Sequence, residues 1–346
     1  MKTIGIITIT DNNNYGNRLQ NFAVEYFLNC NNINTKTIWK KDSWKRKIKN
    51  KMCDTFFFIP YCRRYNNFRF FTDNYTNSFV VDDYNYIDSS LFDYYIFGSD
   101  QIWNLKWQLE KNLPILKLNK KQVISFSASF GVNNIDNSQK KIYCEILQNV
   151  NYISVREDRG KEIVEELTGR TDVEVLVDPT MLLTSNQWDK IAKKPKNLKS
   201  KKYILNYYLG ELSEQKKQEI DRIAKENGCD VINILDKSDP LYISGPSEFL
   251  WLEKNAFLIC TDSFHSSVFA ILYDRPFIIF DREDNEENMN SRIETLLSKF
   301  QLKNREYNGV QITEENLKHD YSVAYEILEK ERVKSKKFLC KALNIE

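Results

Sequence analysis

The architecture of this 346-residue chain is clearest in residues 256–272, which read Ala256-Phe257-Leu258-Ile259-Cys260-Thr261-Asp262-Ser263-Phe264-His265-Ser266-Ser267-Val268-Phe269-Ala270-Ile271-Leu272. The apolar run at 256–260 predicts a buried strand. The apolar residues after the polar turn predict a helix, and a second strand is expected at 276–280. Such a strand–turn–helix–strand unit is typical of parallel α/β proteins, in which ligands bind at the carboxyl ends of strands.

The polar turn of this unit holds His265, one of only two histidines in the chain. The hydroxyls of Ser263, Ser266 and Ser267 surround it in sequence, and backbone N–H groups at the start of a helix attract anions, phosphate in particular. We therefore interpret the turn as a site for an anionic ligand. In the alternative interpretation, Ser263 caps the helix and His265 is an ordinary turn residue.

Apolar runs alternate with amphipathic stretches through most of the chain, which predicts parallel α/β architecture. Strands are expected at 3–9, 94–97, 122–126, 152–155, 173–177, 203–208, 231–235, 256–260 and 277–280. Helices are expected at 19–29, 138–147, 158–167 and 213–227, with a long final helix at 314–343. The clearest boundary is Val177-Asp178-Pro179-Thr180, because proline forces an extended or turning path. It predicts a domain at 1–180, a smaller doubly wound domain at 181–313 and a final helix within 314–346.

Two loops in the first half carry dense polar side chains at the ends of expected strands. In the first, Gly16 permits unusual backbone geometry, and Asn17, Arg18 and Gln20 offer donors that suit sugar hydroxyls or an anion. The alternative is a polar turn with Asn17 as the helix cap. In the second, the segment 97–104 places Ser99, Asp100 and Gln101 beside Trp103. Hydrogen-bonding groups next to an aromatic face are typical of sugar sites, although an aromatic residue in a loop also serves core packing.

Arg156 directly follows the expected strand at 152–155. A guanidinium in that position grips a carboxylate or a phosphate with two parallel hydrogen bonds. Structural pairing with Glu157 is the competing interpretation.

Composition limits the class of protein. A hydrophobic fraction of 42% with 28% charged residues is typical of a soluble globular protein. The sequence has no run of about eighteen apolar residues and no basic-then-apolar leader, so a cytoplasmic protein is expected. The seven cysteines form no CxxC pair and are expected to be reduced thiols. Two histidines are too few for a histidine-rich metal site, and no metal is expected.

The net charge of +2 hides a basic segment at 40–64, where nine Lys or Arg oppose Asp42 and Asp54. This segment carries +7 and interleaves with aromatic residues, as on a helix that contacts an anionic surface. A solvated helix face is the alternative. Nucleic acid is not expected as a partner, because the rest of the chain is acidic and no recognition motif accompanies the segment.

Four of these segments, in this order, resemble the polysaccharide pyruvyl transferase family: Gly16-Asn17-Arg18-Leu19-Gln20, Gly98-Ser99-Asp100-Gln101-Ile102-Trp103-Asn104, Val155-Arg156-Glu157 and Asp262-Ser263-Phe264-His265. The mid-chain Val177-Asp178-Pro179-Thr180 fits the family as well, and the resemblance runs from the first strand to about Phe280. One departure is Ser266, since the family commonly has glycine after the histidine.

The resemblance implies a GT-B-like pair of Rossmann-type domains that face each other across a cleft, with the last helix crossing back to the first domain. It implies phosphoenolpyruvate as co-substrate, with no cofactor, and a hexose in a bacterial surface or capsular polysaccharide precursor, often lipid-linked, as acceptor. The first domain would bind the acceptor and the second the donor. The basic segment would then dock the enzyme peripherally on anionic lipid or on the diphosphate of a lipid carrier.

Under this resemblance His265 delivers or relays a proton and Arg156 clamps the donor. Ser263, Ser266 and Ser267 hold its phosphate. The acceptor falls to the first-domain loops, that is, to Asn17, Arg18, Gln20, Ser99, Asp100, Gln101 and Trp103. Two other functions remain open at this point, a GT-B glycosyltransferase that uses a nucleotide sugar and a non-catalytic sugar-binding relative.

Overall fold

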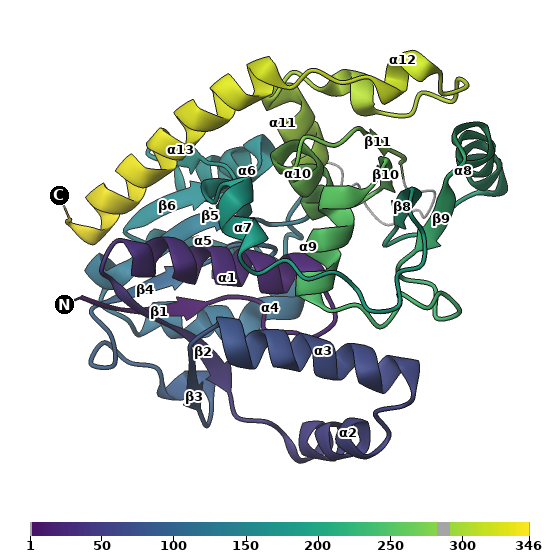
Figure 1. Ribbon diagram of the computed structural model, residues 1–346. Coiled ribbons are helices and arrows are strands. Elements are labelled where there is room, and N and C mark those ends of the chain that lie inside the picture. Colours follow the sequence, from purple (N-terminus) through teal and green to yellow (C-terminus); the bar gives the residue numbers. More distant parts are fainter. Residues whose placement is uncertain (1, 282–290, 346) are drawn as a thin grey trace.

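The computed structural model describes residues 2–281 and 291–345, and two parallel sheets organise them (Figure 1). The larger sheet has seven strands in the order β3-β2-β1-β4-β5-β6-β7. Its strands are β1 Thr3–Ile7, β2 Asn34–Lys40, β3 Ser78–Val81, β4 Tyr94–Phe97, β5 Val123–Ala128, β6 Tyr152–Val155 and β7 Glu174–Val175. The chain reverses its direction of winding between β1 and β4, which makes this pair the switch point of a doubly wound sheet.

The smaller sheet repeats the same principle with four strands in the order β11-β10-β8-β9. These strands are β8 Tyr203–Tyr207, β9 Asp230–Asn233, β10 Leu258–Thr261 and β11 Phe277–Ile279. The winding reverses between β8 and β10. The prediction of two parallel, doubly wound units is therefore confirmed, while the limits assigned to the domains stay a prediction.

The sequence analysis did not predict β2 and β3. Thr35 and Thr37 of β2 are fully buried although they are polar, because their hydroxyls bond Asn29 and Glu25 of the preceding helix. β3 is an edge strand with half of its residues exposed. Neither strand therefore shows the apolar run that marks a central parallel strand.

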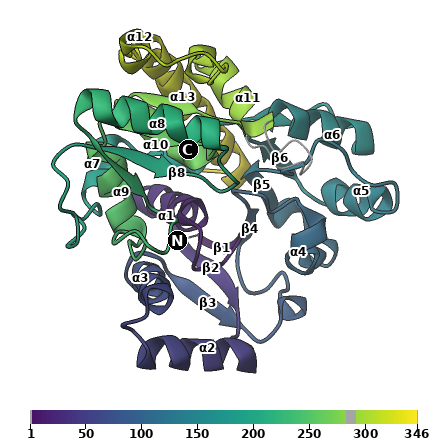
Figure 2. The same ribbon diagram turned by 90° about the vertical axis from the view of Figure 1, so that its right-hand side faces the viewer.

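Helices cover both faces of the larger sheet (Figures 1 and 2). One face carries α4 Leu105–Asn112, α5 Lys140–Gln148 and α6 Asp158–Thr168. The other carries α1 Tyr15–Cys30 and α3 Pro60–Tyr75, on which the second domain rests through α7 Ser185–Asp189, α9 Pro246–Asn255 and α10 Phe264–Leu272. Further helices are α2 Trp44–Thr55, α8 Glu214–Asn227 and α11 Ser291–Lys299.

A single apolar core runs from the first domain into the second. It includes Leu19 of α1, Phe249 of α9 and Phe269 of α10. The ring of Tyr15 stacks on Phe249 with 4.3 Å between centroids, and its hydroxyl donates to the Ser244 carbonyl at 2.8 Å. Because aromatic packing and hydrogen bonds cross the boundary together, the two sheets are held at a defined angle.

The end of the chain differs from the single long helix expected at 314–343. It forms α12 Glu314–Leu317 and α13 Ser322–Leu343, separated at 318–321. The guanidinium of Arg305 donates to the carbonyls of Asn316 and Lys318, both at 2.8 Å, and so takes acceptors that a continuous helix would use. A tertiary contact therefore overrides the local helical pattern.

The final helix crosses back to the first domain, as the resemblance implied (Figure 1). Arg332 of α13 donates to the carbonyls of Met181 and Leu183, at 2.7 and 2.8 Å. Further along, Phe338 stacks on Phe126 of β5 with 6.2 Å between centroids. The carboxyl-terminal helix thus packs against one face of the larger sheet and connects it to the segment that leads into the second domain.

Candidate active site between the two sheets

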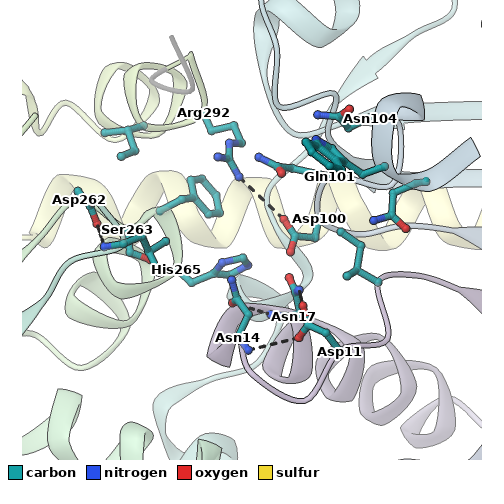
Figure 3. A pocket seen from close by; sticks show the side chains of 16 residues that line it. Asp11, Asn14, Asn17, Asp100, Gln101, Asn104, Asp262, Ser263, His265 and Arg292 are labelled. Carbon is teal, nitrogen blue, oxygen red and sulfur yellow. Dashed lines mark hydrogen bonds and ion pairs between the residues drawn. The ribbon is translucent and has the colours of Figure 1, made fainter. Parts of the chain in front are cut away.

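A cavity of about 400 Å³ lies where the switch points of the two sheets face each other. The first domain supplies the segments after β1 and β4, and the second supplies the segments after β8 and β10, so four strand ends converge there. This is the position at which open α/β sheets bind ligands. Its lining residues are Ile9, Asp11, Asn14, Asn17, Asp100, Gln101, Asn104, Trp107, Gln108, Leu209, Asp262, Ser263, Phe264, His265, Arg292 and Ile293 (Figure 3).

Helices α1, α4 and α10 begin at this cavity, and α11, described from Ser291 onward, lines it as well. Asn14 and Asn104 precede the first turns of α1 and α4, Ser263 precedes α10, and Arg292 lies in the first turn of α11. Each helix start carries a partial positive charge and backbone N–H groups that have no partner within the helix. The cavity also contains carboxylates, so its surface is not uniformly positive. The helix starts instead create local regions that favour an anion.

His265 points into the cavity from the start of α10 and is 7% exposed (Figure 3). Its Nε2 atom lies 3.7 Å from Oδ2 of Asp178, which belongs to the first domain. Gly16 of α1 packs directly against the imidazole: a Cβ atom at position 16 would lie 2.1 Å from Nδ1 of His265. Glycine is required there because the backbone of one domain touches the ring of the other.

Asp178 is the centre of a buried polar network beneath His265. Its Oδ2 accepts hydrogen bonds from Arg156 at 2.7 Å and from the Ser99 hydroxyl at 2.9 Å, while Oδ1 accepts from the backbone and hydroxyl of Thr180. Burial alone would raise the pKa of Asp178, but His265, Arg156 and the N–H of Thr180 outweigh it and hold this pKa far below its usual range. Asp178 therefore stays ionised next to the imidazole.

Arg156 lies under the cavity rather than in it. Its side chain is fully buried, with one nitrogen 2.7 Å from Asp178 and another 2.7 Å from Asp100. Burial alone would raise the pKa of Asp100 as well, and Arg156, His265 and Arg292 together lower it. Both ends of the guanidinium are thus already bound by carboxylates. This placement does not fit the expected clamp on a donor, and it makes Arg156 a positioning residue for Asp100 and Asp178.

Arg292 is the arginine that lines the cavity, and the sequence analysis missed it. Its guanidinium lies 3.9 Å from Oδ1 of Asp100 and beside Gln101 (Figure 3). It belongs to α11, a helix that was not predicted, and no motif surrounds it in the sequence. Only the tertiary structure brings it opposite His265.

The three serines around His265 have different surroundings. Ser263 lines the cavity. Ser266 is fully buried and donates to Glu253 of α9 at 2.6 Å, and Ser267 donates to the carbonyl of Ser263 at 3.0 Å. Ser266 and Ser267 therefore do not line the cavity, and the hydroxyl of Ser266 makes its contact behind the site, with Glu253.

The expected acceptor residues separate into a lining set and a supporting set. Asn17, Asp100 and Gln101 line the cavity. Arg18, Gln20 and Ser99 are fully buried behind it, where Gln20 donates to Thr8 and accepts from the N–H of Ser99, and Arg18 donates to the carbonyl of Ile9. The supporting residues hold the loops in place and do not contact the cavity.

Trp103 also belongs to the supporting set. It is fully buried, stacks between Phe97 and Phe130, and donates from Nε1 to Ser125 at 3.1 Å. The tryptophan at the cavity is instead Trp107, which is 70% exposed. The core-packing alternative was therefore the correct one for Trp103, and sequence alone did not distinguish the two tryptophans.

The described residues also lack two features. No cluster of three or more His, Cys, Asp or Glu side chains in this part of the chain could hold a metal ion. Among the helices within 2–281 and 291–345, none has the length and apolarity that crossing a membrane requires. The seven cysteines are free thiols, as expected.

Facing Rossmann-type domains, a cavity between their switch points and a final helix that crosses back define a protein of the GT-B class. A protein of Listeria monocytogenes described as a UDP-N-acetylglucosamine 2-epimerase has a similar fold, with a TM-score of 0.52 at 10% identity over 97% of this chain and 90% of that one. The UDP-GlcNAc 2-epimerase of Methanocaldococcus jannaschii, solved with UDP-GlcNAc and UDP, gives 0.46 at 15% identity over 95% and 98%. MurG of Acinetobacter baumannii gives 0.46 at 9% identity over 99% of both chains.

The sequence profile of polysaccharide pyruvyl transferases matches residues 14–285, which is most of the chain. The protein belongs to this family. No curated protein matches its sequence at a significant level. The matched range includes Asp178 and His265 but ends before Arg292.

Proposed function

We propose that the protein transfers the three-carbon unit of phosphoenolpyruvate onto two hydroxyls of one hexose, and so forms a pyruvate ketal and releases phosphate. The acceptor would be a precursor of a bacterial surface or capsular polysaccharide. The observation that carries the proposal is His265, which enters a cavity between two domains from a helix start and lies beside a buried, ionised Asp178. Membership of the pyruvyl transferase family supports this choice of reaction.

The donor would lie against the second-domain side of the cavity. Phosphoenolpyruvate carries a phosphate and a carboxylate, so it needs several donors and a concentrated positive charge. The N–H groups at the start of α10, the Ser263 hydroxyl and the guanidinium of Arg292 meet that need, and Asp100 would help to orient Arg292. Arg292 takes the role first expected of Arg156.

His265 would handle the proton. As the first sugar oxygen bonds to C2 of the donor, C3 takes a proton and becomes a methyl group. The second sugar oxygen then bonds to C2, the bond between C2 and the phosphate oxygen breaks, and the remaining hydroxyl proton leaves with phosphate. An imidazole beside an ionised carboxylate is suited to supply and recover such protons. Asp178 would stabilise its charged form and fix the ring.

The acceptor would lie against the first-domain side. Trp107 offers an exposed indole face at the rim, and Asn17, Asp100 and Gln101 offer hydrogen-bonding groups deeper in the cavity. Asn17 donates to Asp11 at 2.7 Å, and its buried Oδ1 has no hydrogen-bond partner among the described residues. A sugar hydroxyl would satisfy this oxygen.

The test measures phosphate release from phosphoenolpyruvate with a panel of hexose-terminated acceptors, and the mass of each product. The wild type should release phosphate and add about 70 Da to an acceptor, whereas His265→Ala and Arg292→Gln should lose both signals. Donor binding is followed separately by thermal shift with phosphoenolpyruvate and with uridine diphosphate. Protection by uridine diphosphate alone, without phosphate release, would overturn the proposal in favour of a nucleotide-sugar glycosyltransferase.

A further inference from the structure

α2 forms the outer edge of the first domain. It lies at the lower end of the molecule in both views, with α3 above it (Figures 1 and 2). Its inner side is fixed to α3 by a small cluster in which Cys53 packs with Cys62 and Tyr65. Asn50 of α2 also accepts a hydrogen bond from the hydroxyl of Tyr65 at 2.7 Å. One side of the helix is therefore anchored and the other faces away from the molecule.

The outward side of α2 carries a row of apolar side chains. Trp44, Ile48 and Met52 follow one another at intervals of four residues and so lie on one face of the helix. The turn into α3 extends this face with Phe56, Phe57 and Phe58. These six side chains, called here the α2 stripe, are between 42% and 68% exposed. Contiguous exposed apolar residues of this size mark an interaction surface rather than an ordinary solvated helix.

The cations of the basic segment divide into two groups. Lys40, Lys41 and Arg46 form ion pairs with carboxylates of the first domain, and Arg64 turns inward to the carbonyls of Tyr242 and Asn13. Five cations have no carboxylate within 4 Å among the described residues: Lys45, Lys47, Lys49, Lys51 and Arg63. All five lie on α2 or at the start of α3. The uncompensated charge therefore lies on the same elements as the α2 stripe, although the Lys49 ammonium is directed toward α3, 4.3 Å from the centroid of the Tyr65 ring.

We propose that the α2 stripe and its five flanking cations form a docking surface for an anionic phospholipid bilayer. Trp and Phe side chains would enter the boundary between headgroups and acyl chains, while the lysines would remain at the level of the lipid phosphates. Each part strengthens the other, because apolar insertion alone or a few basic residues alone give only weak binding.

A second copy of the chain is a less suitable occupant. A symmetric contact would place the same five cations opposite themselves, and like charges across an interface are unfavourable. A bilayer supplies the opposite charge and the apolar interior together. The surface is also connected to the site, since α3 leads from it to Arg64, which contacts Asn13 beside the cavity-lining Asn14.

The docking inference does not rest on the proposed reaction, because it is tested by binding alone. Full-length protein is sedimented with vesicles of phosphatidylcholine containing 30% phosphatidylglycerol, and with vesicles of pure phosphatidylcholine. We expect binding to the anionic vesicles that weakens as salt is raised. Lys47→Gln with Lys51→Gln should lower the partition coefficient by about 30-fold, since each cation near such a surface contributes about fivefold.

Phe57→Ser with Phe58→Ser should lower it further, on the order of 100-fold, because two exposed rings lose their apolar environment. Two matched controls should bind as the wild type does: Tyr86→Ser, an equally exposed aromatic residue, and Lys336→Gln with Lys337→Gln on α13. Failure of the wild type to sediment with anionic vesicles overturns the inference. So does binding that the α2 variants leave unchanged, or a dimer in sedimentation velocity that Phe57→Ser with Phe58→Ser dissociates.

Discussion

The two walls of the cavity are built on different principles. The first-domain wall is backed by a fixed array of charges, in which the buried Arg156 joins the buried Asp178 to Asp100, the member of the array that lines the cavity. The second-domain wall presents the start of α10 with His265, and its Asp262 is bound by the N–H groups of Leu209 and Gly210 at 2.8 Å. In the proposed reaction the first wall sets the electrostatic field and the second supplies the group that exchanges protons. The proposed chemistry therefore requires both walls.

Removing the proton-exchanging group should have the largest effect on rate. His265→Gln should lower kcat by about 10²- to 10⁴-fold, because a side chain that cannot titrate replaces the acid–base group. Phosphate release under saturating donor and acceptor measures it. The other histidine, at position 319, provides the control, and His319→Gln should keep the wild-type rate. If both variants were equally active, His265 would not be the residue that transfers the proton.

Removing the cation of the first wall should affect folding most. Arg156→Met removes the cation that two buried carboxylates share, so the free energy of unfolding should fall by about 3–5 kcal/mol. Urea denaturation measures this loss. Arg159→Met breaks the exposed pairs with Glu162 and Glu166 on α6 and should cost about 1 kcal/mol at most. Equal losses in the two variants would contradict the fixed-array interpretation.

The same variant should change the response to acid. The pKa values of Asp100 and Asp178 are lowered in the folded protein, partly by Arg156. Carboxyls with lowered pKa values contribute stability that is fully present above their ordinary pKa of about 4. This stability is lost as the pH falls from that value through the lowered pKa of the folded state. Without Arg156 both pKa values rise, so acid unfolding of Arg156→Met should begin at a higher pH than that of the wild type. Circular dichroism between pH 7 and pH 2 measures acid unfolding. If Arg156 did not lower these pKa values, the wild type and Arg156→Met would unfold at the same pH.

A smaller effect is expected at the rim of the first wall. Trp107→Ala should raise the KM for the sugar acceptor about 5- to 10-fold and leave kcat and the KM for phosphoenolpyruvate nearly unchanged, because it removes a binding surface away from the reacting atoms. Initial rates at varied acceptor concentration measure this. Tyr86→Ala removes a similarly exposed ring that does not line the cavity and should change neither constant. A lower kcat for Trp107→Ala would place the indole at the reaction itself.

The smallest effect on rate is expected behind the second wall. Ser266→Gly restores the residue common in the family but removes the hydrogen bond to Glu253, whose pKa burial raises well above its usual value. The rate should stay within about twofold, while the free energy of unfolding should fall by about 1–3 kcal/mol. Ser266→Ala separates the lost hydrogen bond from the flexibility of glycine. A large gain in rate for Ser266→Gly would mean that the serine restricts the donor after all.

Local sequence pattern was sufficient for much of the fold, because central parallel strands such as β1, β5 and β10 are short apolar runs bounded by turns. It failed at β2, where the buried threonines bond Asn29 and Glu25 of the preceding helix, and at the break before α13, where Arg305 takes the carbonyls. Both failures have the same cause: the decisive partner is a side chain on a neighbouring element, which the pattern of the segment itself does not show.

The site shows the same division. His265 was found because a polar turn between apolar runs is visible locally. The sequence did not show that Trp107 rather than Trp103, and Arg292 rather than Arg156, lines the cavity. Local pattern places a residue near a strand end, but it does not say whether the side chain points toward the cavity or toward the core. Burial decided both cases, and burial depends on all of the surrounding elements.

The contact between Gly16 and His265 has a geometric consequence for the whole molecule. The backbone of α1 and the imidazole approach so closely that even a methyl group has no room between them. At this point the two domains are therefore in direct contact and cannot approach more closely. The spacing between the proposed donor side and the proposed acceptor side is thus set by the contact of the α1 main chain with the His265 ring.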